Sequence, residues 1–256
     1  MSGAVDDARE SLKRVPGLVP IVRRGREART AATRAAENAR WFVGARLRRD
    51  VRIDAYLRTH DVRKLQLGTG SNPMDGWLNT DVVDYRRRNE VVYLDAHEPF
   101  PLPDGAFDLV FSEHMIEHLT YTDGRRCLAE CLRVLRPSGR IRVATPSLDR
   151  LIALYGDELT DLQRRYLTWS IDTFVRDADA YLPGFVLNNM FWNFAHRFVY
   201  DEATLRHALK TAGFVDVEAW PVGESGDPRL VGLERHMRSA TEFNVLETMV
   251  LEARRP

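Results

Sequence analysis

The fold is decided by the stretch Leu-Gln-Leu-Gly-Thr-Gly-Ser-Asn (65–72), in which a short apolar run ends in two closely spaced glycines. Glycine there lets the backbone turn sharply and lets a ligand lie against the main chain with no Cβ in the way. A plain tight turn is the alternative. A nicotinamide dinucleotide site would need a third glycine at position 73 and an acid about 20 residues further on. Pro73 and the early Asp81 do not fit that pattern, so the loop favours a nucleoside without phosphates.

Apolar runs of strand length alternate with helical patterns around this loop. Strands are predicted over 64–67, 77–83, 91–94, 107–111, 141–144, 215–222 and 245–253, and helices over 125–135 and 204–212. Only seven residues separate Gly70 from Leu78, which is too few for a full first crossover helix. The predicted class is α/β, a Rossmann-like, mostly parallel sheet with helices on both faces and ligands beyond the carboxyl ends of its strands.

Composition limits the class of protein further. The 256 residues are 44% hydrophobic and 29% charged, which is typical of a soluble globular chain. No apolar run approaches the roughly 18–20 residues of a membrane span, and the start lacks the apolar stretch of a secretory signal. The two cysteines, Cys127 and Cys131, exclude a disulfide scaffold or a four-cysteine zinc site. We therefore expect a cytoplasmic protein.

The net charge of zero hides an asymmetry. Residues 1–64 hold 16 Lys and Arg against 8 Asp and Glu, whereas residues 65–256 hold 21 against 29. Residues 1–58 are predicted to form a basic helical arm and residues 59–256 the main domain. The arm packs on the acidic body, lies on an anionic membrane surface or contacts nucleic acid. The second alternative would place the protein peripherally at the inner membrane surface.

Five motifs then follow one another in a specific order. They are Leu-Gly-Thr-Gly-Ser-Asn (67–72), Gly-Trp-Leu-Asn-Thr-Asp (76–81), Pro-Leu-Pro-Asp-Gly-Ala-Phe-Asp-Leu-Val (101–110), Ser-Glu-His-Met-Ile-Glu-His-Leu (112–119) and Arg-Val-Leu-Arg-Pro-Ser-Gly (133–139). With this set, roughly residues 62–255 resemble class I S-adenosylmethionine-dependent methyltransferases, most of all a short-loop branch in which Gly-Trp-x-Asn-x-Asp follows the glycine loop. The resemblance implies a seven-stranded sheet with a reversed last strand. Gln66 and Asn72 depart from it, since an acid and a glycine are usual there.

The resemblance also implies a set of cofactor contacts. Gly68 and Gly70 would line the methionine and ribose portions of S-adenosylmethionine, and Asp81 would bind the ribose hydroxyls. Asp95 with Ala96 would hold adenine, and the end of the fourth strand would lie beside the sulfonium. The full predicted set is Leu67, Gly68, Thr69, Gly70, Asn72, Asp81, Asp95, Ala96, Ser112 and Glu113.

Two segments carry the catalytic candidates. His114, Glu117 and His118 stand at i, i+3 and i+4, so on a helix they would share one face. His114 is predicted to be the general base, because histidine titrates near neutral pH. Alternatively, these three residues hold Mg²⁺, as the resemblance to some sugar and quinol O-methyltransferases implies, or His118 is a structural contact. Residues 114–118 also match the His-x-x-Glu-His motif of one group of zinc proteases, which would need a long helix that carries the zinc ligands.

His196 is the second candidate for the base. It ends the aromatic segment Asn-Phe-Ala-His-Arg-Phe (193–198), where a hydrogen-bonded structural role is the alternative. The predicted catalytic residues are therefore His114, His196 and Glu117.

Residues 151–200 are predicted to form a helical lid over the acceptor. They hold 11 of the 24 aromatic residues and carry a small negative charge, which argues against a nucleic-acid partner. Aromatic rings beside amides and carboxylates suit a neutral polyol. We thus predict an O-methyltransferase acting on a hydroxyl of a small or carbohydrate-like acceptor, such as a glycan or glycolipid precursor. The alternative is a catalytically degenerate nucleoside-binding or scaffold module; the oligomeric state stays open.

Overall fold

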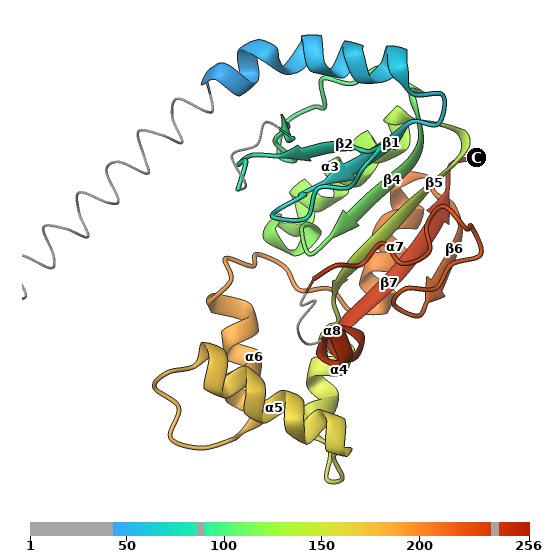
Figure 1. Ribbon diagram of the computed structural model, residues 1–256. Coiled ribbons are helices and arrows are strands. Elements are labelled where there is room, and N and C mark those ends of the chain that lie inside the picture. Colours follow the sequence, from blue (N-terminus) through green and yellow to red (C-terminus); the bar gives the residue numbers. More distant parts are fainter. Residues whose placement is uncertain (1–42, 86–89, 237–240) are drawn as a thin grey trace, which may run out of the picture. The chain divides into compact units, whose positions relative to one another are not determined.

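A seven-stranded sheet organises the computed structural model, which describes residues 43–85, 90–236 and 241–256. The strand order is β3-β2-β1-β4-β5-β7-β6. The strands are β1 (Lys64–Leu67), β2 (Leu78–Asp81), β3 (Val92–Tyr93), β4 (Phe107–Glu113), β5 (Leu135–Pro146), β6 (Val215–Trp220) and β7 (Thr248–Arg254). All pairs among β1 to β5 are parallel, and β7 is antiparallel to both of its neighbours. The predicted mostly parallel sheet with a reversed last strand is confirmed (Figure 1).

Strand order reverses between β1 and β4, and this switch point places the ends of three strands together. Leu67 pairs with Thr80 of β2 on one side and with Ser112 of β4 on the other. The loops that follow β1, β2 and β4 therefore open at one edge of the sheet. Residues 71–77 contain no helix, as the short spacing between Gly70 and β2 predicted.

Two amphipathic helices cover one face of the sheet, namely α3 (Tyr121–Val134) and α7 (Glu202–Ala212). Both begin at a side chain that caps the first turn, Thr120 for α3 and Asp201 for α7. Their buried residues join a core with alternate positions of the central strands. The opposite side of β4 meets loop residues, and that cluster comprises Met74, Trp77, Leu109, Phe111, Leu230 and Leu233.

The segment between β5 and α7 is helical and has its own core. It contains α4 (Leu148–Ile152), the 3-10 turn η2 (Ala153–Tyr155), α5 (Asp161–Phe174) and α6 (Pro183–Trp192). Helix α8 (Thr241–Glu247) packs against α5, and Phe243 joins the same cluster as Tyr166 and Met190. Figure 1 shows α5 and α6 beyond the carboxyl end of β5, on the side where ligands bind in open α/β sheets.

Three predicted boundaries differ from the structure. The helix predicted over 125–135 begins at Tyr121, because Thr120 caps it there, and ends at Val134, where β5 takes over from Leu135. The strand predicted over 245–253 begins only at Thr248, since the residues before it belong to α8. The remaining six predicted strands overlap β1, β2, β3, β4, β5 and β6, and β5 extends beyond the predicted residues 141–144 at both ends.

The chain divides into two compact units, residues 1–47 and 48–256, rather than near residue 58. Residues 43–59 are helical, and Ile53 and Tyr56 are buried in the core of the larger unit. The Tyr56 hydroxyl accepts from the Lys64 amide at 2.8 Å and donates to the Lys64 carbonyl at 3.0 Å, which ties residues 48–59 to β1. The predicted arm otherwise lies outside the described residues, so its alternatives stay predictions.

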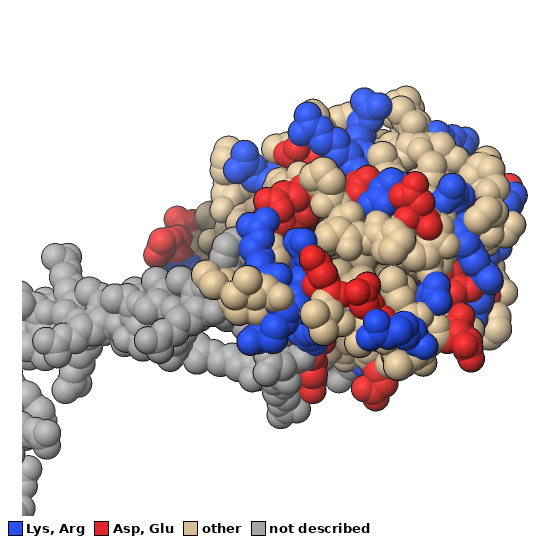
Figure 2. Space-filling model, turned by 90° about the horizontal axis from the view of Figure 1, so that it is seen from above, with Lys and Arg blue, Asp and Glu red and all other residues tan. Residues whose placement is uncertain are grey.

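The surface of the larger unit mixes charges of both signs. On the face shown in Figure 2, Lys and Arg side chains are interspersed with Asp and Glu side chains. That view of the described residues offers no broad basic patch of the kind that binds nucleic acid. Within the described part of the chain, no helix combines the length and apolar character needed to cross a membrane.

A buried ion cluster fastens the loop over residues 221–236 to the sheet. Arg142 of β5 is fully buried and donates to the carboxylates of Glu234 at 2.6 Å and Glu252 at 2.5 Å. It also donates to the Glu224 carbonyl at 2.8 Å, while Glu234 accepts from the Gly223 amide at 2.9 Å. Each charge in this cluster depends on the others, because an ion left unpaired in the interior is strongly destabilising.

We expect Arg142→Met to lower the free energy of unfolding by about 3–5 kcal/mol, since it removes the buried cation that Glu234 and Glu252 share and leaves Glu252 only Arg140, at 3.5 Å. Arg254→Met on β7 is the matched control, because Arg254 pairs with the exposed Asp216 and should lose less than about 1 kcal/mol. Urea unfolding at neutral pH measures both. Equal losses for the two variants would contradict the role given to the cluster.

Candidate functional site

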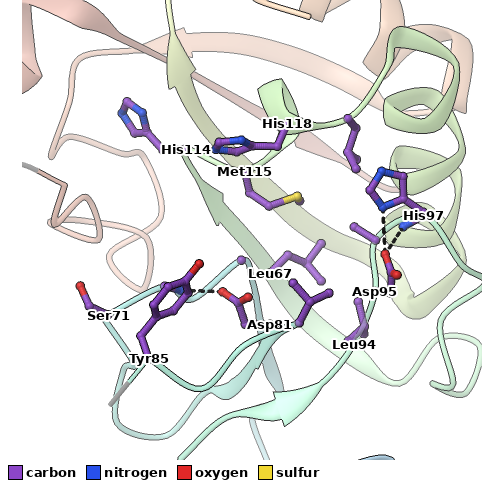
Figure 3. Close-up of a pocket in the computed structure, with 15 residues that line it drawn as sticks. Leu67, Ser71, Asp81, Tyr85, Leu94, Asp95, His97, His114, Met115 and His118 are labelled. Carbon is purple, nitrogen blue, oxygen red and sulfur yellow. Dashed lines mark hydrogen bonds and ion pairs between the residues drawn. The ribbon is translucent and has the colours of Figure 1, made fainter. Parts of the chain in front are cut away.

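A cavity of about 460 Å³ opens at the carboxyl ends of β1, β2 and β4 (Figure 3). In Figure 3, Asp81 and Tyr85 lie on one side of it, and His114, Met115 and His118 lie on the other. Six of the ten predicted cofactor residues line it: Leu67, Gly68, Gly70, Asp81, Asp95 and Ala96. The other lining residues, which the motifs did not single out for this purpose, are Ser71, Val82, Tyr85, Leu94, His97, Met115 and Leu119, with His114 and His118.

Gly68 makes the floor of this cavity possible. Its φ is +65°, a left-handed conformation that glycine adopts without strain. A Cβ on Gly68 would lie 2.4 Å from Cγ of Met115, which itself lines the cavity. Gly70 also has a positive φ, of +56°, but has open space where a Cβ would stand. A Cβ is therefore excluded at Gly68 by the nearby Met115 side chain, whereas the left-handed backbone conformation favours glycine at both Gly68 and Gly70.

Asp81 is held by main-chain donors at the end of β2. One carboxylate oxygen accepts from the Gly70 amide at 2.8 Å and the other from the Val83 amide at 3.1 Å. Burial raises the pKa of Asp81, while these amides act in the opposite direction. Each carboxylate oxygen keeps further acceptor capacity beside the cavity, which suits a ligand with neighbouring hydroxyl groups.

Asp95 and its neighbours form the end of the cavity beyond β3. The Asp95 carboxylate accepts from the His97 amide at 2.9 Å and lies 2.9 Å from Nδ1 of the His97 ring. Leu94 and Ala96 add apolar surface beside this carboxylate. The combination of one acceptor with apolar walls can hold a planar heterocycle with an exocyclic amine.

Four predicted cofactor residues do not line this cavity, namely Thr69, Asn72, Ser112 and Glu113. Thr69 and Ser112 are buried beneath the loop and the strand end. The Asn72 carbonyl accepts from the Gln66 side chain at 3.2 Å, so these two departures from the family pattern contact each other. Glu113 accepts from the amides of Arg235 and His236 at 2.8–2.9 Å, and thus anchors the end of the loop over residues 221–236.

His114, Glu117 and His118 do not share a helix face. His114 has a φ of +47°, and only a single 3-10 turn, η1 (Ile116–His118), follows it. This geometry also contradicts the zinc-protease alternative, which needs both histidines on one long helix. His114 Nδ1 lies 3.4 Å from the fully buried Glu117 carboxylate, and its Nε2 lies 3.0 Å from the Thr248 hydroxyl. Both ring nitrogens are therefore engaged by the protein.

The contacts of His114 indicate which of its ring nitrogens carry a proton. The Thr248 hydroxyl donates to Asn244 at 2.6 Å, so it accepts from His114 Nε2–H. The other nitrogen, Nδ1, faces a carboxylate. Burial alone would lower the pKa of His114, but Glu117 next to it raises the pKa above the ordinary value. Nε2 of His114 is therefore a donor to Thr248, and Nδ1 faces the buried Glu117 carboxylate at ion-pair distance without a hydrogen bond.

His196 has the opposite arrangement. Its Nδ1 donates to the Met190 carbonyl at 2.7 Å, which leaves the lone pair of Nε2 available. Burial lowers the pKa of His196, so the ring is neutral at pH 7. Its ring meets that of His118 edge-on, with centroids 4.9 Å apart. Of the two histidines predicted as the base, His196 is the one with a lowered pKa and with an Nε2 that makes no hydrogen bond.

Two further hollows meet the first one at these histidines. A cavity of about 240 Å³ lies between the sheet end and α5 and α6, with Tyr166, Phe174, Met190 and Phe194 in its walls. A groove of about 1140 Å³ runs past Phe191 and Trp192. His114 lines the first cavity and the 240 Å³ cavity, His118 the first cavity and the groove, and His196 the groove and the 240 Å³ cavity.

Sequence reasoning missed His236 and Glu247, which line the 240 Å³ cavity. The His236 ring stacks on His114 with centroids 3.9 Å apart, and burial with the neighbouring His114 lowers its pKa to about 4. Glu247 is buried and accepts from the Tyr166 hydroxyl. Both residues reach the site from segments far along the chain, so no local motif marks them.

The three residues predicted for Mg²⁺ are divided between two groups of convergent ligand atoms. Among the residues that the structure describes, one group is Glu117, His118 and His196, and the other is His114, His236 and Glu247. The structure therefore replaces His114 by His196 beside Glu117 and His118.

Comparison with known proteins points to one family for the segment that builds this site. Residues 65–143 match the family model described as a methyltransferase domain. The segment is also similar to a probable S-adenosylmethionine-dependent methyltransferase of Mycobacterium tuberculosis, with 45% identity over 60 residues, which is 23% of this chain and 21% of the relative. An uncharacterized 37.1 kDa transposon protein of Streptomyces fradiae is 35% identical over 89 residues, 35% of this chain and 24% of that protein.

These curated relatives match only 60–89 residues of this chain, and the chain spans only about a fifth to a quarter of their length. Among solved structures, a SAM-dependent methyltransferase of Archaeoglobus fulgidus is 20% identical with a TM-score of 0.45, covering 84% of this chain and 94% of the other. The methyltransferase-domain segment contains every predicted cofactor residue and the His114–His118 turn, whereas His196, His236 and Glu247 lie beyond it.

We expect Glu113→Gln to loosen the loop over residues 221–236, because both amides would lose a charged acceptor and an NH₂ in place of Oε2 would face the Arg235 amide. The free energy of unfolding should fall by about 1–3 kcal/mol, and amide hydrogen exchange at Arg235 and His236 should accelerate. Glu158→Gln, at an exposed position, is the charge-matched control. Unchanged exchange at both amides would show that Glu113 does not anchor the loop.

Proposed function

We propose that the chain is an S-adenosylmethionine-dependent methyltransferase that acts on a hydroxyl group of a small or carbohydrate-like acceptor. The observation that carries this proposal is the junction of hollows at the sheet edge. A cavity with a glycine floor and two strand-end aspartates opens, at His114 and His118, onto the hollows beside α5 and α6. This arrangement brings a nucleoside site and a second substrate site together at one point.

The residues of the first cavity fit the cofactor. Gly68 provides a floor that a Cβ would fill, and the Asp81 carboxylate has acceptor capacity for two ribose hydroxyls. Asp95 with Leu94 and Ala96 would hold the adenine ring. The bound cofactor would supply an electrophilic methyl group on its sulfonium, so the protein's task is to place the acceptor oxygen about 3–3.5 Å from that methyl.

The acceptor is proposed to enter through the groove and the 240 Å³ cavity. Aromatic rings line both hollows, and Trp192 at the groove is 81% exposed. The polar groups among them include Asn189, Ser170 and Asp123, which can bind hydroxyls. Exposed rings beside neutral and acidic polar groups suit a sugar better than a phosphate-bearing polymer, which would need Lys and Arg.

His196 is proposed as the histidine that acts on the acceptor hydroxyl. It lines both acceptor hollows, and its Nε2 lone pair is free. His114 is proposed instead to orient the site, because its Nε2 binds Thr248 and its Nδ1 faces the buried Glu117 carboxylate at 3.4 Å. The hydrogen bonds of the two rings support this choice between the two predicted bases.

Calorimetry with S-adenosylmethionine and with its demethylated product tests the cofactor, and methyl transfer from labelled cofactor to a panel of glycans and polyols tests the reaction. We expect binding of both nucleosides and transfer to at least one hydroxyl acceptor. Failure to bind either nucleoside would remove the enzyme proposal. Binding without transfer to any acceptor would favour the alternative of a degenerate nucleoside-binding or scaffold module.

Gly68→Ala should weaken cofactor binding by at least about tenfold, because the new Cβ forces Met115 toward the cavity. Gly232→Ala is the matched control: its φ is +68° and nothing lies within 4 Å of the new Cβ. Both substitutions place alanine in a left-handed conformation at a cost of roughly 1–2 kcal/mol, so calorimetric affinity separates the clash from the strain. Equal affinities for the two variants would argue against a cofactor at Gly68.

His196→Ala should lower turnover by about 10²–10⁴-fold, the usual contribution of a positioned acid–base group. Cofactor affinity should stay within about threefold, since His196 does not line the first cavity. His207→Ala, at an exposed position on α7, should leave both quantities unchanged. Full turnover by the His196 variant would show that the acceptor hydroxyl is activated elsewhere.

A further inference from the structure

Three side chains with metal-ligating atoms converge where the three hollows meet. The carboxylate of Glu117 and the rings of His118 and His196 each offer one atom, and these atoms lie within 4.8 Å of one another. The backbone holds the two segments together: the Glu117 carbonyl accepts from the amides of Arg197 at 2.7 Å and Phe198 at 3.1 Å. His196 therefore comes from a segment that is hydrogen-bonded directly to the backbone of Glu117.

The Glu117 carboxylate is incompletely satisfied by the protein. The residue is fully buried, and its Oε2 accepts from the Thr145 hydroxyl at 3.0 Å. Its Oε1 has no hydrogen-bond partner, and the nearby His114 Nδ1 lies at 3.4 Å. Buried carboxylate oxygens normally have full hydrogen-bonding or metal partners, because the charge is costly to bury otherwise. The vacant oxygen thus marks a place for a cation.

His196 is oriented as metal-binding histidines usually are. Its Nδ1–H donates to the Met190 carbonyl, which fixes the tautomer with the lone pair on Nε2. A backbone carbonyl bound to the far nitrogen is a common partner of a histidine ligand. Three protein ligands would leave further coordination positions of a metal ion open to other ligands.

We propose that Glu117, His118 and His196 bind one divalent transition-metal ion. Two imidazoles and one carboxylate suit Mn²⁺, Fe²⁺, Co²⁺ or Zn²⁺ better than Mg²⁺, which prefers oxygen ligands. This proposal differs from the predicted Mg²⁺ site in one ligand, since His196 takes the place of His114, and in the ion that is bound. The consequence for catalysis rests on the proposed function: His118 and His196 line the acceptor hollows, and a divalent ion lowers the pKa of a bound oxygen. His196 would then act on the acceptor hydroxyl through the ion.

The neighbouring group of His114, His236 and Glu247 is already satisfied without an ion. His114 Nε2 donates to Thr248, and Glu247 accepts from the Tyr166 hydroxyl. The two imidazole rings stack face to face, with centroids 3.9 Å apart and planes inclined by 19°. The structure therefore favours one of the two candidate groups as the metal site.

The test uses the untagged full chain, stripped with a chelator and titrated with Co²⁺. We expect visible d–d absorption that saturates at one ion per chain, and a rise in melting temperature with Co²⁺, Mn²⁺ or Zn²⁺ that exceeds the rise with Mg²⁺. His196→Ala and His118→Ala should each weaken Co²⁺ binding by more than about tenfold. His236→Ala and His207→Ala should leave the affinity within about twofold.

Three outcomes would overturn the proposal: no saturable Co²⁺ spectrum, a site lost in His236→Ala but kept in His196→Ala, or equal affinity in all four variants. Glu117→Gln adds a fourth check only if circular dichroism shows that it folds, since it alters a fully buried group. Calorimetry with S-adenosylmethionine on the metal-free chain is scored separately. Nucleoside binding without metal binding would remove this proposal and leave the proposed function standing.

Discussion

The buried carboxylate of Glu117 is the constraint on which the candidate site depends. A charge that is fully excluded from water must be neutralised or hydrogen-bonded by what surrounds it. Here the surroundings come from three parts of the chain: Thr145 of β5, His114 at the end of β4, and the segment bearing His196, whose following amides bind the Glu117 carbonyl. The Glu117 carboxylate thus contacts His114 and Thr145, and the Glu117 main-chain carbonyl holds the segment that follows His196, so one residue joins the helical insertion to the sheet.

A second constraint acts from the far side of the sheet. Arg142 and Glu234 hold the loop over residues 221–236, and Glu113 binds the amides at its end. Because Glu113 is adjacent to His114 in the chain, the strand that presents one histidine also positions the stacked ring of His236. The chemical groups of the site thus depend on buried charges that face away from the cofactor cavity.

The short crossover and the glycine loop could be predicted because each depends on local sequence, whereas the reversed last strand was implied by the family resemblance. These features are recognised from residues that are close together in the sequence: two glycines after an apolar run, a carboxylate at each following strand end and seven residues between Gly70 and Leu78. The beginning of the last strand could not be, since α8 is a short helix whose apolar residues also fit a strand. His236 and Glu247 were missed because they join the site through tertiary contacts across more than a hundred residues, with no spacing rule to mark them.

The roles of His114 and His196 show most clearly what could not be predicted from the sequence. From the sequence, His114 and His196 were equivalent candidates, since both follow elements expected near the cofactor. Their difference lies in the groups beside the ring nitrogens. His114 has the Thr248 hydroxyl at Nε2 and the buried Glu117 carboxylate 3.4 Å from Nδ1, whereas His196 has a backbone carbonyl at Nδ1. A carbonyl cannot donate, so it leaves the opposite nitrogen of His196 with a lone pair. His196 also belongs to the group of convergent ligand atoms that includes Glu117, whose Oε1 makes no hydrogen bond. One residue's partner therefore determines both which histidine can react and which ion could bind beside it.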